Sequence, residues 1–387
     1  MKTVHPVLKR GGLFWDRAML PVQAYAERYQ RMQEAIAAAG DDGWLLYGDV
    51  ERYGSVAYVS NFLPRTRSAL ALVPRQGAPV LLASVGLRDI PAAKALTWIE
   101  DVRPFTNLPK TLAALIEEKK LTNGRLGLVG LDDSMPVTEW DAIAASLPRV
   151  SWQARNDALL LLRQRKDSWE LAAIRRVAAA VESALDLAPQ LLKPGATMRQ
   201  VAAGLDREIR RKAAEDVRIL CASGNQVATA LRPADDRPLA KGDVVMLFIA
   251  AEIQRYWAEG ARTYVLGAPS AEMLALAGKV GEALGAMRGS ARAGAEVRQL
   301  FAAASDKLDG LADSAALYGL GHGIGLDADE APIIDKGASG KLQPDSTLGL
   351  HLIVHAGRLG IAVGQTIVAR GDNAESLNDA APLIECR

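Results

Sequence analysis

The sequence has little cysteine, almost no net charge and no long apolar run. Only two cysteines occur among 387 residues, Cys221 and Cys386, and no CxxC pair accompanies them. This excludes a disulfide-rich scaffold and a zinc knuckle. The formal net charge is +1, and no basic stripe with interleaved aromatic residues is present, so nothing attracts nucleic acid or an anionic membrane.

No apolar run approaches the ~20 residues that a membrane span requires. The N-terminal segment MKTVHPVLKRGG also lacks the apolar core of a secretory signal. We therefore expect a cytoplasmic protein that binds neither membranes nor nucleic acid. What the chain does contain is 49% hydrophobic residues, enough to form the cores of two domains.

The first part of the chain alternates helical and strand-like patterns. Residues 24–39 have the pattern of an amphipathic helix, and residues 43–47 form a short apolar run that ends at a turn. Two further apolar runs, 70–73 and 80–83, flank the turn sequence PRQG, and residues 126–130 resemble a buried strand. This alternation predicts an α/β domain over residues 1–157.

From about residue 158 onward the chain contains an internal repeat. Residues 194–203 (PGATMRQVAA) match residues 293–302 (AGAEVRQLFA) at Gly, Ala, Arg, Gln and the final Ala. Each copy follows a long Ala-rich helix pattern, and Ser168 is the predicted N-cap of the first of these helices. Strand-rich stretches follow both copies, so residues 158–387 are predicted to form an α+β domain with a pseudo-two-fold repeat.

A series of short motifs follows residue 163. They are Arg165-Lys166 with Glu170, Ser223-Gly224, Lys241-Gly242-Asp243, Arg262-Thr263, Gly321-His322-Gly323-Ile324-Gly325, Glu330-Ala331-Pro332 and Leu342-Gln343-Pro344. In this order they resemble the pita-bread domain of the creatinase, prolidase and aminopeptidase P superfamily, the group of peptidase family M24. The first domain resembles the smaller α/β domain of that family through residues 58–62 and Arg67. The resemblance implies a homodimer in which the N-terminal domain of one subunit covers the cleft of the other.

The resemblance also implies where a metal site would lie. Peptidases of this family bind two divalent ions through two Asp, one His and two Glu. Those five positions fall on Phe248, Glu259, His322, His351 and Gly364. Because phenylalanine and glycine supply no side-chain ligand, we expect a divergent member that lacks the two-metal site.

Three of these positions keep groups that bind metals. Glu259, His322 and His351 form a set suited to a single Zn, Fe or Mn ion with open coordination positions. The same residues also allow metal-free catalysis, with His322 as general acid or base and Glu259 as its partner. We therefore expect either no cofactor or one divalent ion, and catalytic roles for all three residues.

Four further residues are candidates for binding a small-molecule substrate: Arg67, Arg232, Arg262 and His355. The arginines suit a carboxylate, and His355 shares a strand face with His351. The reading favoured by the resemblance is creatinase-like hydrolysis of a non-peptide C–N bond in a small polar, carboxylate-bearing molecule. The alternatives are a mononuclear metal enzyme for hydrolysis, elimination or oxidation, and a ligand-binding homologue without catalysis.

Overall fold

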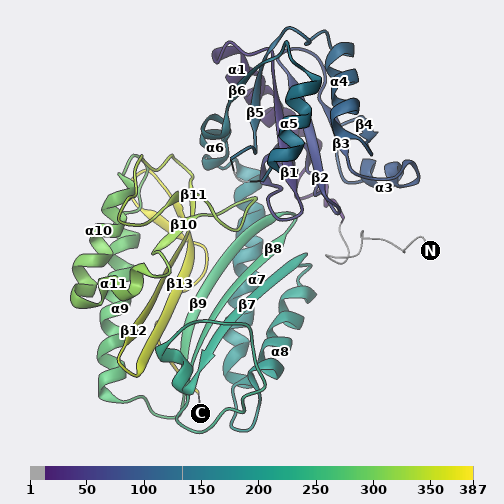
Figure 1. Ribbon diagram of the computed structural model, residues 1–387. Coiled ribbons are helices and arrows are strands. Elements are labelled where there is room, and N and C mark those ends of the chain that lie inside the picture. The colour runs from purple at the N-terminus through teal and green to yellow at the C-terminus, as the bar shows by residue number, and fades with distance from the viewer. Residues whose placement is uncertain (1–13, 133, 387) are drawn as a thin grey trace. The chain divides into compact units, whose positions relative to one another are not determined.

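The computed structural model describes residues 14–132 and 134–386, in two compact units that comprise residues 1–163 and 164–387 (Figure 1). The predicted domain boundary at residue 157 lies inside helix α6 (Asn156–Gln164). The N-terminal segment that lacks the pattern of a secretory signal is outside the described residues. Among the described helices, none combines the length and apolar character that crossing a membrane demands.

The first unit is built on a six-stranded sheet in the order β4-β3-β2-β1-β5-β6. Only β2 runs against its neighbours, so the other five strands share one direction. The strands are β1 (Gly43–Asp49), β2 (Ser68–Pro74), β3 (Val80–Ala83), β4 (Asp101–Pro104), β5 (Arg125–Val129) and β6 (Ser151–Ala154). The helices are α1 (Val22–Ala38), α2 (Gly54–Ser60), the short η2 (Leu87–Asp89), α3 (Ile90–Lys94), α4 (Leu108–Glu118), α5 (Val137–Ser146) and α6.

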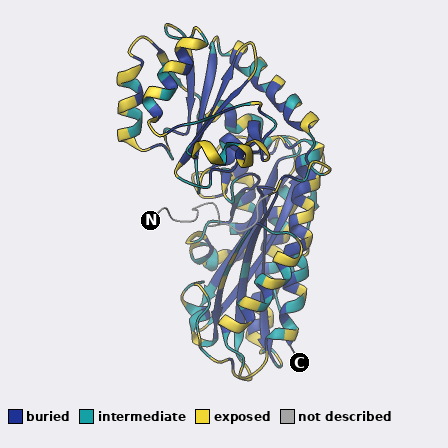
Figure 2. Ribbon diagram, turned by 90° about the vertical axis from the view of Figure 1, so that its right-hand side faces the viewer, coloured by how far each residue is buried: buried dark blue, intermediate teal, exposed yellow. Residues whose placement is uncertain are grey.

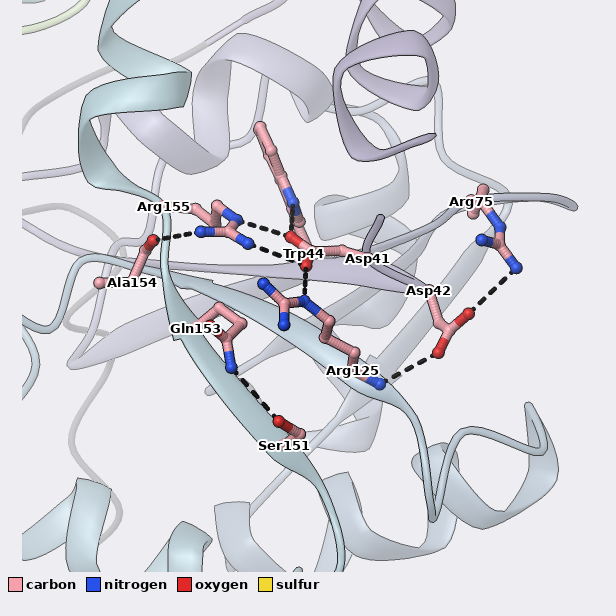
Figure 3. Close-up of polar contacts among 9 residues, drawn as sticks. All are labelled: Asp41, Asp42, Trp44, Arg75, Arg125, Ser151, Gln153, Ala154 and Arg155. Carbon is pink, nitrogen blue, oxygen red and sulfur yellow. Dashed lines mark hydrogen bonds and ion pairs between the residues drawn. The ribbon is translucent and has the colours of Figure 1, made fainter. Parts of the chain in front are cut away.

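A buried carboxylate ties the parallel strands of this sheet together (Figure 3). Asp41, just before β1, is fully buried and accepts a hydrogen bond from Trp44 Nε1 at 2.8 Å. It also accepts from Arg125 Nε at the start of β5 (3.0 Å) and from Arg155 Nε just after β6 (2.7 Å). One acidic side chain therefore contacts three neighbouring strands or their flanking residues.

The second unit is a nine-stranded sheet whose main path is β11-β10-β12-β13-β9-β8-β7, with β14 added to β13 and β15 to β9. Helices α7 to α9 pack against the strands on one face, and α10 packs on α9 (Figure 1). The strands are coloured as buried along most of their length (Figure 2). The elements are α7 (Ser168–Leu191), α8 (Met198–Arg211), β7 (Asp216–Ser223), η3 (Gly224–Ala228), β8 (Val244–Ile253), β9 (Tyr256–Leu266), α9 (Ala271–Ser290), α10 (Val297–Leu308), η4 (Asp309–Leu311), α11 (Ala312–Ala316), β10 (Gly321–Gly323), β11 (Glu330–Ile333), β12 (Thr347–Ala356), β13 (Leu359–Ala369), β14 (Ala374–Ser376) and β15 (Ile384–Cys386).

The predicted internal repeat is present in this unit. Helices α8 and α10 begin at equivalent positions of the two sequence copies, and each follows a long helix. The backbone N–H of Gly195 donates to Leu239 in the first copy, and that of Gly294 donates to Leu342 in the second. The two copies thus share local hydrogen bonding as well as sequence. The predicted combination of an α/β unit with a pita-bread α+β unit is confirmed.

The start of α7 differs from the prediction by one residue. Asp167, and not Ser168, is the N-cap, and its carboxylate accepts from the backbone N–H of Glu170 at 2.8 Å. Glu170 in turn accepts from the backbone N–H of Asp167 at 2.9 Å, which completes a capping box. Asp and Ser are both good N-caps, and the hydrogen bond that Glu170 accepts from the backbone N–H of Asp167 favours Asp167.

Candidate metal centre

Strand pairing brings three candidate ligands to one face of the large sheet. On β9, Arg262 and Tyr264 point toward α7, so Glu259 points to the opposite face, because side chains alternate along a strand. His351 on β12 pairs with Gly364 on β13, and Gly364 pairs with Ala261 on β9. Ala261 is two residues after Glu259, so both side chains lie on the same face of β9. Because the central β13 residue has no side chain, groups from β9 and β12 can approach each other across it.

The three side chains form a compact cluster. His351 Nδ1 lies 2.8 Å from Glu259 Oε1, and His322 Nε2 lies 3.5 Å from Glu259 Oε2. One possible ligand atom from each residue falls within 4.8 Å of the others. The exposed fraction of the side chain is 2% for Glu259, 7% for His351 and 17% for His322. Only His322, on the short strand β10, is substantially open to solvent.

Backbone carbonyls satisfy the outward ring nitrogens of both histidines. Nε2 of His351 lies 3.4 Å from the carbonyl oxygen of Tyr318, and Nδ1 of His322 lies 2.9 Å from that of Gly323. With these nitrogens donating to the carbonyls, a divalent ion would displace the proton of the other nitrogen of each ring and bind there beside Glu259. This second-sphere arrangement is typical of metal-binding histidines. The donor set therefore fits a divalent ion.

Glycines provide the room for this cluster. A Cβ atom on Gly349, which faces His322 across β10 and β12, would collide with the carboxylate of Glu259. Gly321 has φ +142°, and a Cβ there would collide with the carbonyl of Gly349. The glycines of β10 and β12 thus allow close approach of backbone and ligands, which a side chain would prevent.

The charges of the cluster are strongly coupled. Burial raises the pKa of Glu259, but the charges of His322 and His351 and the hydrogen bond from His351 outweigh it and hold that pKa below its usual value. Burial lowers the pKa of His351, but the charge and hydrogen bond of Glu259 raise it above its usual value overall. Glu259 is therefore a carboxylate at neutral pH, the form in which it binds cations.

Apolar groups lie beside the cluster. The Phe248 ring lies edge-on to the His351 ring, with centroids 5.7 Å apart and an interplanar angle of 89°. Phe248 pairs with Ala261, in the same cross-strand row as Gly364 and His351. Leu231 and Tyr318 pack around the same small apolar core as Phe248. This side of the cluster thus offers an aromatic wall where the family resemblance places a further metal ligand.

Two of the predicted substrate-binding arginines, Arg262 and Arg232, are not members of the three-residue cluster. The side chain of Arg262 is 3% exposed and forms ion pairs with Glu182 and Asp186 of α7. It therefore lies on the helix-covered face of β9, opposite to the face of Glu259, so the predicted substrate-binding arginine is not part of the Glu259 cluster. Arg232 is exposed, and its guanidinium donates to Thr229 Oγ1 at 3.1 Å.

The other two predicted residues are outside the three-residue cluster. On β12, Nδ1 of His355 donates a hydrogen bond to the carbonyl of Val227 at 2.6 Å, and the His355 ring lies 5.9 Å from that of Tyr318. Arg67 belongs to the first unit, where it lines a cavity of about 560 Å³. His355 therefore contacts Tyr318, which packs with Phe248 beside the cluster, but His355 is not one of the three candidate ligands.

Sequence reasoning did not identify the residues that orient the ligands. Thr366 Oγ1 accepts from the backbone N–H of Glu259 and donates to its carbonyl, both at 2.9 Å. The backbone carbonyl of Tyr318 lies 3.4 Å from Nε2 of His351 and orients that ring. Neither role leaves a residue-type signal, because a backbone carbonyl is common to all residues and Thr366 lies in an apolar strand.

Comparisons with known proteins agree with this architecture. Residues 172–370 match the model of metallopeptidase family M24, and residues 28–191 match that of the creatinase/prolidase N-terminal domain. The crystal structure of dipeptidase PepE from Mycobacterium ulcerans superposes with a TM-score of 0.82 at 24% identity, covering 97% of this chain and all of that one (100%). The structure of an X-Pro aminopeptidase from Thermotoga maritima gives 0.81 at 22% identity, over 92% of this chain and 99% of that one.

Similar sequences carry names of peptidases. The probable dipeptidase PepE of Mycobacterium tuberculosis is 27% identical over 92% of this chain and 95% of its own length. The Xaa-Pro dipeptidase of Pyrococcus furiosus is 25% identical over 57% of this chain and 65% of its own length.

These names overturn the creatinase-like interpretation. The relatives are dipeptidases and Xaa-Pro dipeptidases, so the predicted hydrolysis of a non-peptide C–N bond is wrong. That interpretation relied on the missing ligands at Phe248 and Gly364, which bear on the number of ions and do not identify the substrate. The family match spans more than half of the chain and includes Glu259, His322 and His351. This protein belongs to metallopeptidase family M24.

Proposed function

We propose that this chain hydrolyses the peptide bond of a small peptide with one divalent metal ion bound by Glu259, His322 and His351. The observation that carries the proposal is the cluster itself: three ligand atoms within 4.8 Å, with the outward nitrogen of each histidine at a backbone carbonyl. The names of the dipeptidase relatives support a peptide substrate.

The residues around the cluster support a single ion. Of the five positions that hold two ions in the peptidases, Phe248 and Gly364 supply no donor atom. The Phe248 ring also packs edge-on against His351, so an apolar group lies beside the remaining ligands. A Cβ on Gly364 would lie 3.0 Å from the Cβ of His351, which leaves little room for a larger ligand there. Two imidazoles and one carboxylate suit Zn, Fe or Mn.

The chemistry divides between the ion and the chain. A divalent ion supplies a Lewis acid that polarises a carbonyl and lowers the pKa of water toward 7. In hydrolysis the carbonyl–nitrogen bond breaks, the hydroxyl of water stays on the carbonyl carbon, and its proton leaves with the amine. Glu259 contributes negative charge, and the carbonyls of Tyr318 and Gly323 fix the orientation of the two imidazoles. The Phe248 ring gives the site an apolar surface on the side of His351.

The test combines metal analysis with peptide cleavage. Protein purified without chelator should contain about one equivalent of Zn, Fe or Mn, and His322→Ala should lose it while keeping its far-ultraviolet circular dichroism. The wild type should cleave members of a dipeptide panel that includes Xaa-Pro peptides, and chelator should stop the reaction. Re-adding the ion should restore the cleavage.

Other outcomes reject separate parts of the proposal. Two equivalents of metal in the wild type would reject the single-ion site. One equivalent that persists in His322→Ala would reject the assigned ligands. Stoichiometric metal without cleavage of any dipeptide would reject the peptidase activity while leaving the metal site in place.

A further inference from the structure

The first unit contains a cavity of about 560 Å³ whose lining residues all belong to that unit. Its lining comes from the loop that precedes β2, the segments that follow β3 and β4, and helix α3. Its volume is within the range of about 300–1,000 Å³ of small-molecule sites. The residues that matter for its chemistry are Phe62, Arg65, Arg67, Arg88, Leu96 and Phe105.

The cavity lies at the edge of the sheet where β3 and β4 end. Ala83, at the end of β3, pairs with Pro104 at the end of β4 and with Ala69 at the start of β2. The cavity lining includes the residues that follow both of these parallel strands. Because five of the six strands share one direction, this is the carboxyl edge of the sheet.

The lining combines an apolar floor with positive charge. Phe62, Leu96 and Phe105 are 3%, 5% and 7% exposed, so their positions are fixed by packing. Three arginines and one acid, Asp89, also line the cavity, which gives a formal charge of 3 − 1 = +2. An apolar floor and a cationic rim together favour an anion that has an apolar body.

Arg67 has a special position in this rim. Its backbone has φ +46°, in the left-handed region that residues other than glycine rarely adopt. The preceding Thr66 donates from Oγ1 to the carbonyl of Ser84 at 2.6 Å, and the following Ser68 begins β2. The backbone of Arg67 is therefore held between two anchored neighbours, while its side chain is exposed at the cavity. Such backbone conformations are concentrated at ligand sites.

We propose that this cavity is a second ligand site, which binds a small organic carboxylate with an apolar body. Arg67 binds the carboxylate through two parallel hydrogen bonds, the geometry that a guanidinium and a carboxylate share. The apolar body lies on the floor formed by Phe62, Leu96 and Phe105. This proposal does not depend on the peptidase activity, because no residue of the metal centre takes part in it.

The experiment is isothermal titration calorimetry of the full chain with phenylacetate, hexanoate and 3-phenylpropionate. Acetate and benzyl alcohol serve as probes that lack the apolar body and the charge, respectively. The wild type should bind at least one apolar carboxylate saturably and neither control probe. Arg67→Gln should weaken that binding about tenfold, the effect of losing about 1.4 kcal/mol of interaction. Ala92→Phe, at an exposed lining residue, should block the cavity and abolish binding.

Two controls locate the binding. Arg149→Gln removes an exposed arginine of the same unit that is not part of the lining, and it should leave the affinity unchanged. His322→Ala should also leave it unchanged, because the metal centre is not involved. The proposal is overturned if none of the three carboxylates binds. It is equally overturned if binding survives both Arg67→Gln and Ala92→Phe, or disappears in His322→Ala.

Discussion

At the scale of single residues, the metal centre depends on which histidine occupies which strand position. His351 and His355 both belong to β12, but only His351 lies within hydrogen-bond distance of Glu259. His355 instead contacts the carbonyl of Val227. The two residues are therefore a matched pair, in which the same substitution distinguishes a ligand from a neighbour.

We expect His351→Ala to weaken metal binding more than the roughly 10–100-fold that loss of a second-sphere partner costs. His355→Ala should leave the affinity for the metal unchanged. Competition titration with a chromophoric chelator measures both. Equal losses in the two variants would contradict the assigned ligand set.

Arg262 leads to a second prediction at this scale. Its guanidinium connects β9 to Glu182 and Asp186 of α7 and lies away from the metal centre. Burial lowers the pKa of Arg262, but the two carboxylates raise it above its usual value overall, so its guanidinium stays charged at any ordinary pH. Arg262→Met should therefore lower the free energy of unfolding by about 1–3 kcal/mol without changing KM for a cleaved peptide. Urea unfolding and steady-state kinetics check this, and a raised KM at unchanged stability would restore the substrate-binding role.

At the scale of secondary-structure elements, Asp41 joins the start of β1 to β5 and the end of β6 (Figure 3). Burial raises the pKa of Asp41, but hydrogen bonds from Arg155, Trp44 and Arg125 and the charge of Arg155 hold it below the usual value overall. The folded state thus binds its proton less readily than the unfolded chain. The stabilising contribution is complete above the unfolded pKa of about 3.9 and is lost as the pH falls through the lower folded pKa.

Asp41→Asn should therefore destabilise the first unit by about 2 kcal/mol near neutral pH. The difference from the wild type should stay constant down to about pH 5 and shrink below about pH 4, because the wild-type carboxylate then becomes neutral as well. Urea unfolding at a series of pH values measures this difference. A difference that does not change down to pH 3 would show that the ionised carboxylate is not the stabilising form.

Some secondary-structure elements could be predicted from the sequence and others could not. The repeat and its helices were predictable because each copy begins with a Gly-Ala turn and a helix start that local chemistry determines. The alternation of apolar runs likewise predicted β1 to β3, whereas β10 has only three residues and no periodicity. Arg262 lies three residues from Glu259 on β9, and this spacing puts the two side chains on opposite faces of the strand.

The metal centre itself was only partly accessible from sequence. Glu259, His322 and His351 could be located because they occupy landmark positions, and the structure brings them within 4.8 Å. Whether they bind an ion stays a prediction. Thr366 and the carbonyl of Tyr318 could not be found, because their roles arise from strand register and main-chain position. The homodimer and the cytoplasmic location also stay predictions.

At the scale of the whole molecule, the two units should respond differently to metal. A ligand that binds only the folded state stabilises it by about 2.7 kcal/mol at 100 times its Kd. The ligand set lies in the unit of residues 164–387. Metal should therefore raise the melting temperature of that unit by roughly 5–10 °C, and the transition of the other unit should stay where it is.

Differential scanning calorimetry with and without chelator measures this shift. In His322→Ala the chelator should have no effect on either transition. A chelator-sensitive transition that persists in this variant would place the bound metal elsewhere in the chain.

The internal repeat gives the metal centre one more property. Glu259 comes from the first helix–helix–strand copy, while His322 and His351 come from the second, and β9 and β13 meet along the seam between them. Neither copy holds the full ligand set. An ion bound by these three residues would therefore also stabilise the association between the two halves of the sheet.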